Sequence, residues 1–105
     1  MRRFLASIAV FLSAAYAAVM VARAQDPPPG KAPYDRVCKV CHGTDGKGDA
    51  APALVPFELE DEDLLIRVRE GGGEMPPISA NRVSDEQVKQ IAAYLRSLGP
   101  PDKAR

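Results

Sequence analysis

A chain of 105 residues is long enough for one domain, and its 14 basic and 14 acidic residues give a formal net charge of zero. This balance argues against a nucleic-acid-binding protein, because such proteins need a basic surface. A chain of this length builds only a marginal apolar core by itself, so a buried cofactor would be a substantial part of the fold.

The N-terminal residues 1–24 have the pattern of an export signal. Two arginines precede an uncharged stretch from Phe4 to Ala22, which is typical of the basic and apolar regions of a signal peptide. Small residues at 22 and 24 predict cleavage before Gln25, which would leave a net charge of −3, although Ala15 and Ala17 fit the same cleavage rule. The stretch is also long enough to be an uncleaved membrane anchor. We therefore expect an exported, periplasmic protein that is membrane-bound only if residues 1–24 are retained.

The rest of the chain divides into an arm, a domain and a tail. Residues 25–30 include three consecutive prolines and predict an extended N-terminal arm. The domain follows over residues 31–99, and residues 100–105 form a charged tail. The domain begins with a predicted helix from about Lys31 to Val40, because apolar residues recur there at spacings of three and four. These residues are Tyr34, Val37, Cys38 and Cys41.

The segment Cys38-Lys39-Val40-Cys41-His42 contains both cysteines and the only histidine of the chain. The pattern C-x-x-C-H is the attachment sequence of c-type haem, in which each thiol adds to a vinyl group and the imidazole is an axial iron ligand. A dithiol redox site would need a neighbouring βαβ pattern, and a structural zinc site needs about four ligands. A plain disulfide would not need His42. Haem c is the cofactor that accounts for all three residues.

A second helix is predicted from Asp61 to Glu70, after loops over residues 43–51 and 52–59. Acidic residues crowd its first turn, where the positive end of the helix dipole favours them. Three glycines, at 71 to 73, end it. Its predicted buried stripe consists of Leu64, Leu65 and Val68.

Met75 is the one methionine beyond residue 24, and it lies in a loop rich in glycine and proline from Glu74 to Arg82. A thioether is a soft ligand for haem iron, and pairing it with histidine raises the reduction potential. Alternatively, Met75 packs against a helix. In that case the sixth iron position would be open to gases or peroxide.

The last helix has the clearest local signals. Ser84 and Gln87 form a predicted capping box, and Gly99 with the following prolines ends the helix. No segment predicts a strand, so we expect an all-α domain. The residues expected on the buried face are Val88, Ile91, Ala92, Leu95 and Leu98.

Taken together, residues 30–99 resemble the class I cytochromes c of the small bacterial type. The resemblance rests on the haem motif continued by Gly43, on Met75 with the proline after it, and on the order and spacing of these features. Residues of the first and last helices also match family positions at which the two helices cross. These are Gly30 and Tyr34 in the first helix, and Ile91 and Tyr94 in the last.

The resemblance implies a small fold of about three main helices and loops wrapped around one covalently bound haem. It implies that Cys38 and Cys41 attach the haem and that His42 and Met75 are the axial iron ligands. It also implies that the carbonyl of Pro52 accepts the N–H of His42, which fixes the imidazole tautomer.

The resemblance further implies a one-electron carrier between redox partner proteins, not an enzyme, and we expect a monomer. Two alternatives stay open, namely a haem-bearing subunit of a larger dehydrogenase or oxidase complex and a five-coordinate ligand-binding protein. The chain lacks the tryptophan that often donates to a haem propionate. Arg67, Arg69 and Arg82 are candidates for that role, and the sequence does not select among them.

Overall fold

A computed structural model describes residues 27–99 of the protein. Strand pairing in this range is limited to one isolated bridge between Gly72 and Met75, so the predicted all-α class is confirmed. The proposed signal or anchor over residues 1–24 and the tail over 100–105 lie outside the described residues. The helices are α2 (Lys31–Val37), α3 (Lys39–His42), the 3₁₀ helix η1 (Thr44–Gly46), α4 (Asp61–Glu70) and α5 (Asp85–Ser97).

The first predicted helix is divided into α2 and α3. The prediction was one continuous helix to Val40, whereas the structure has a turn at Cys38, where φ is −107°. Helical hydrogen bonding nevertheless continues across the turn, because Cys38 N–H donates to Tyr34 O and His42 N–H donates to Cys38 O. The helical path extends two residues beyond the predicted end and carries both cysteines and the histidine.

The crossing of α2 and α5 is confirmed at the predicted positions. A Cβ atom built on Gly30 would collide with the carbonyl of Gln90 in α5, so only glycine allows this approach of the two backbones. Next to it, the rings of Tyr34 and Tyr94 lie 5.6 Å apart at an angle of 56°, the tilted geometry that aromatic pairs prefer. Tyr34 is fully buried and Tyr94 is 3% exposed.

The bounds of α4 agree with the prediction. Its first turn holds three acidic residues, and Gly71 ends it with a φ of 72°, in the left-handed region that favours glycine. Leu64 and Val68 are buried as predicted, whereas Leu65 is half-buried.

The start of α5 is the predicted capping box. Ser84 Oγ accepts the N–H of Gln87 at 3.1 Å, and Gln87 Oε1 accepts the N–H of Ser84 at 2.9 Å. The helix ends one residue earlier than its apolar pattern suggests, with Leu98 as the C-cap. The other residues predicted for its inner face are buried, and so is Tyr94.

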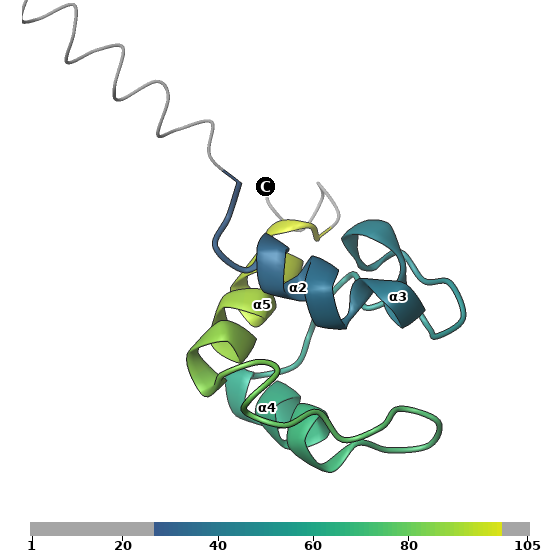
Figure 1. The fold of residues 1–105 in the computed structure, drawn as a ribbon. Helices are drawn as coiled ribbons and strands as arrows, with labels where there is room; N and C mark the ends of the chain where they lie inside the picture. Colours follow the sequence, from purple (N-terminus) through teal and green to yellow (C-terminus); the bar gives the residue numbers. More distant parts are fainter. Residues whose placement is uncertain (1–26, 100–105) are drawn as a thin grey trace, which may run out of the picture.

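Helices α4 and α5 run antiparallel and are joined by an ion pair at each end. Arg69 pairs with Asp85 at 2.6 Å, and Arg96 pairs with Asp61 at 2.7 Å. Figure 1 shows α2 and α3 on one side of the domain and α4 on the other. No helix between residues 27 and 99 is long and apolar enough to cross a membrane.

Candidate functional site

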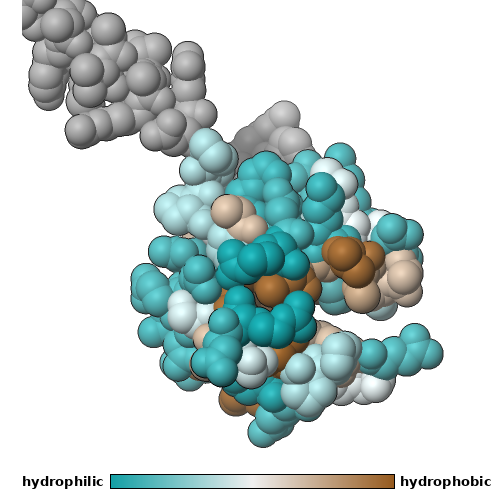
Figure 2. Space-filling model, in the orientation of Figure 1, coloured by the Kyte–Doolittle hydropathy of each residue, from teal (hydrophilic) through white to brown (hydrophobic). Residues whose placement is uncertain are grey.

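The helices enclose a cavity of about 800 Å³, within the range of small-molecule and cofactor sites. In Figure 2 it opens as a notch in the surface, with apolar residues at its floor. All four α helices contribute to its wall, and most of the lining is apolar. The apolar lining residues of the core are Leu64, Val68, Ile78, Val83, Val88, Ile91 and Leu95.

Cys38, Cys41 and His42 all line this cavity. Both cysteines are free, and Cys38 is half-buried while Cys41 is exposed. Burial raises the pKa of the Cys38 thiol to about 11, so at neutral pH this sulfur is a neutral, soft group on an apolar wall. The short helix α3 therefore presents two thiols and one imidazole to a single space.

The orientation of His42 is set by a hydrogen bond to Pro52. His42 Nδ1 lies 2.8 Å from the carbonyl oxygen of Pro52. A carbonyl can only accept, so Nδ1 carries the proton and Nε2 keeps its lone pair. The loop between them is folded back by two backbone bonds, from Gly48 N–H to His42 O and from Ala51 N–H to Cys41 O. The imidazole is thus presented in the tautomer that can bind a metal.

Met75 lies in the loop after α4, where it lines the cavity and is half-buried against the core. Gly72 and Met75 exchange two backbone hydrogen bonds, of 3.0 and 2.9 Å. A Cβ at Gly71 would collide with the Met75 carbonyl, so the tight turn needs glycine there. Gly73, at the tip, has a φ of 57° and space for a Cβ with nothing within 4 Å. Backbone hydrogen bonds therefore hold the base of the loop together, and its tip has room for a side chain.

The three arginines left open by the sequence have different surroundings. Arg69 is not at the cavity, since its guanidinium donates to the carbonyls of Ile78 and Val83 and to Asp85. Arg67 and Arg82 both line the cavity. The candidates for an anionic group on a cofactor are therefore Arg67 and Arg82.

Sequence reasoning missed Arg36, which also lines the cavity. Its Nη2 donates to the carbonyl of Arg82 at 3.1 Å and to Gln87 Oε1 at 3.4 Å. These partners lie 46 and 51 residues away in the chain. No local pattern could have indicated such contacts.

The cavity suits a flat, apolar, iron-bearing ring better than a bare ion. Two thiols, an imidazole nitrogen and a thioether border one apolar space, and these are the donor types that bind haem and its iron. Among residues 27–99, no three His, Cys, Asp or Glu side chains form a group that could hold a metal ion.

Comparisons with known proteins agree with this chemistry. Residues 25–95 match the profile of the family described as cytochrome C oxidase, cbb3-type, subunit III. The chain is 40% identical over 73 residues to the cytochrome c subunit of 4-cresol dehydrogenase [hydroxylating] from Pseudomonas putida, in a match covering 69% of the chain and 62% of that protein. It is 28% identical over 100 residues to cytochrome c6 of Thermosynechococcus vestitus, covering 90% of the chain and 89% of the relative.

A further relative is much longer than the part it shares with this chain. The cbb3-type oxidase subunit CcoP of Azospirillum brasilense is 28% identical over 81 residues, which are 67% of the chain and 28% of CcoP. The chain thus spans less than two thirds of the dehydrogenase subunit and under a third of CcoP. No solved structure matches the chain.

Proposed function

We propose that this chain, which belongs to the class I cytochrome c family, carries single electrons on one covalently bound haem c. When bound, the haem supplies an Fe(III)/Fe(II) couple that takes up and releases one electron. The observation that carries the proposal is that His42 lines the same apolar cavity as Met75. The imidazole is held there by the hydrogen bond from Nδ1 to the Pro52 carbonyl. We propose His42 and Met75 as the axial ligands.

Each side chain has a defined task in this proposal. Cys38 and Cys41 would hold the haem: each S–H would add across a vinyl C=C bond, with a C–S bond formed and the thiol hydrogen passed to the other carbon. The Pro52 carbonyl holds the proton on Nδ1 and leaves Nε2 free to face the iron. Met75 supplies a soft sulfur that favours the reduced iron. The apolar wall excludes water, and the proposed role involves no bond making at the iron.

The axial ligands can be tested by the optical spectrum of the oxidised holoprotein. We expect a weak charge-transfer band near the red edge, from the methionine sulfur and Fe(III). The band should disappear in Met75→Ala, and the reduced variant should bind carbon monoxide. If the unmutated protein lacks the band and binds carbon monoxide readily, the electron-carrier function is wrong and a five-coordinate ligand-binding protein takes its place.

A second candidate function is that of an electron-transfer subunit in a larger complex. The similarity to a dehydrogenase cytochrome subunit and to an oxidase subunit favours it. Purification of the native protein at low and high salt distinguishes the two functions. A free carrier should elute as a monomer at both salt concentrations, and a subunit should elute with its enzyme.

We also propose that the protein is exported to the periplasm, with residues 1–24 as the signal. The uncharged stretch after two arginines supports this. Mass spectrometry of the haem-loaded protein should give a chain beginning at Gln25. Recovery of the full chain from the membrane fraction would instead identify residues 1–24 as an anchor.

A further inference from the structure

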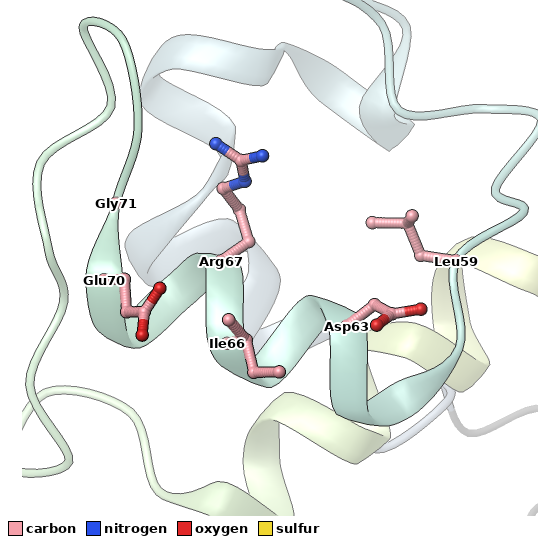
Figure 3. Close-up of a pocket in the computed structure, with 6 residues that line it drawn as sticks. All are labelled: Leu59, Asp63, Ile66, Arg67, Glu70 and Gly71. Atoms are coloured by element: carbon pink, nitrogen blue, oxygen red, sulfur yellow. The ribbon is translucent and has the colours of Figure 1, made fainter.

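Arg67 belongs to two pockets at once. A smaller pocket of about 350 Å³ beside α4 shares Leu59 and Arg67 with the large cavity. Figure 3 shows the Arg67 side chain extending away from α4, and Arg67 is among the residues that line the large cavity. The guanidinium therefore faces the proposed haem site.

The orientation of Arg67 is unexpected for a residue of its helix. Asp63 lies four residues before it and Glu70 three residues after it, spacings at which ion pairs form along a helix. Figure 3 shows the guanidinium directed away from both carboxylates. No hydrogen bond or ion pair joins Arg67 to any residue of the part of the chain that the structure describes. Its five N–H donors are available to a group in the cavity.

Gly72 provides the space through which this side chain passes. A Cβ on Gly72 would collide with Nη1 of Arg67. Gly72 is not among the glycines with positive φ, so its backbone would accept another residue. Because the atom in the way is the end of a flexible side chain, a larger residue at position 72 would displace the guanidinium from this place.

The position of Arg67 matches the part of the haem that bears negative charge. Haem carries its two carboxylates on the edge opposite the vinyl groups, and the proposed vinyl partners, Cys38 and Cys41, lie at the α2–α3 side. Arg67 comes from α4, on the other side of the domain (Figure 1). Arg82 is tied through its carbonyl to Arg36 of α2, the helix that leads into the cysteines. Arg67 is thus the better placed of the two cavity arginines.

We propose that Arg67 binds a haem carboxylate through its guanidinium and raises the reduction potential of the iron. The inference rests on the proposed function, since it requires haem c in the cavity. A guanidinium matches a carboxylate with two parallel N–H···O bonds. Reduction removes one positive charge from the iron, so a cation held nearby favours the reduced state.

The reduction potential provides the first test, measured by equilibrating the holoprotein with a redox dye. Arg67→Met should lower the equilibrium constant for reduction about threefold to tenfold, which corresponds to about 28 to 59 mV at 59 mV per tenfold. Arg67→Lys keeps the charge and should recover most of this loss. The matched control Arg82→Met removes an equal charge from the same cavity and should change the constant less than twofold.

A second test observes the carboxylate itself. Infrared difference spectra between the oxidised and reduced states, on protein whose haem carries ¹³C-labelled carboxylates, should show shifted carboxylate bands in Arg67→Met but not in Arg82→Met. Gly72→Ala should displace the guanidinium and shift the bands in the same direction. The methionine–iron band, measured in parallel, shows whether each variant keeps its axial ligands.

The outcomes separate this inference from the proposed function. If Arg82→Met changes the potential and the bands more than Arg67→Met, the assignment to Arg67 is overturned. Unchanged potential and bands in Arg67→Met overturn it as well. If the unmutated holoprotein lacks the methionine–iron band while Arg67→Met still lowers the potential, Met75 is wrong as a ligand and Arg67 stands.

Discussion

Arg69 Nη2 and Asp85 Oδ1 lie 2.6 Å apart and join the end of α4 to the first turn of α5. The same guanidinium donates to the carbonyl oxygens of Ile78 at 3.1 Å and Val83 at 2.9 Å. The loop that carries Met75 begins after Arg69 and ends before Asp85. One half-buried side chain therefore holds both ends of this loop together.

Removing this side chain should destabilise the protein and loosen the loop. Arg69→Met leaves two carbonyls and a carboxylate without their donor, at a cost of about 1–3 kcal/mol in the free energy of unfolding. We expect a lower midpoint of thermal unfolding. We also expect carbon monoxide to displace the Met75 sulfur from the reduced iron more readily than in the unmutated holoprotein.

Arg96→Met provides the matched control. Arg96 bonds to the Leu59 carbonyl and to Asp61, so its loss should destabilise the protein without touching the loop of Met75. Equal carbon monoxide binding by the Arg69 and Arg96 variants would show that Arg69 has no particular influence on the loop.

Gly30→Ala should disrupt the crossing of α2 and α5. The added methyl group would overlap the Gln90 carbonyl, and overpacking of this kind typically costs about 1–3 kcal/mol. Thermal unfolding followed by circular dichroism measures the loss. In Gly99→Ala the new Cβ would lie 3.3 Å from the Arg96 carbonyl, a tight contact that a shift of a few tenths of an ångström relieves, so this control should lose less stability than Gly30→Ala. Equal midpoints for the two variants would contradict the close approach of the helices.

The raised pKa of Tyr94 predicts that the protein loses stability at alkaline pH. Burial raises its pKa from 10.0, and its hydrogen bond to Asp45, 2.8 Å long, raises it further. The folded protein thus favours the neutral phenol, and this contribution is complete below about pH 10. As the pH rises above 10, the unfolded chain ionises first, so the free energy of unfolding falls by up to about 1.4 kcal/mol per pH unit.

Denaturant titrations of the holoprotein between pH 8 and 11 test whether the free energy of unfolding falls in this way. Tyr94→Phe should be less stable than the unmutated protein at pH 8, because it lacks the bond to Asp45. The difference in the free energy of unfolding between the two proteins should become smaller as the pH rises, since phenylalanine does not ionise. If this difference in the free energy of unfolding stays constant from pH 8 to 11, Tyr94 is not a source of the loss of stability at alkaline pH.

Loss of haem should unfold the domain. Leu64, Val68 and Leu95 belong both to the core and to the cavity wall. Without haem this apolar wall is exposed to water, at about 25 cal/mol per Å² of apolar surface, a large loss against the stability of a small domain, about 5–15 kcal/mol. The variant with both Cys38→Ser and Cys41→Ser, produced without haem, should show low helicity and no cooperative melting. A cooperative transition with native helicity would contradict this.

The local signals in the sequence predicted much of the fold. The acidic first turn and the glycines bounded α4, and the Ser84 capping box located the start of α5. The turn at Cys38 has no such signal, because the apolar spacing continues through it. Periodicity reports which face of a segment is buried, but not whether its backbone bends.

Contacts between distant residues could not be predicted. Arg69 was a candidate for a haem propionate, yet its partners are carbonyls and Asp85. Likewise, the bond of Tyr94 to Asp45 spans 49 residues and depends on how the helices pack. A charged residue in the sequence does not reveal whether its partner belongs to the chain or to a cofactor.

The open tip at Gly73 suggests a use in bioelectronics. A side chain at this position has nothing within 4 Å of its Cβ, and it sits two residues from Met75. A non-glycine residue with positive φ costs about 1–2 kcal/mol, which a haem-loaded domain should tolerate. Gly73→Cys would then provide a tether for wiring the protein to a gold electrode, close to the proposed iron ligand and away from the crossing of α2 and α5.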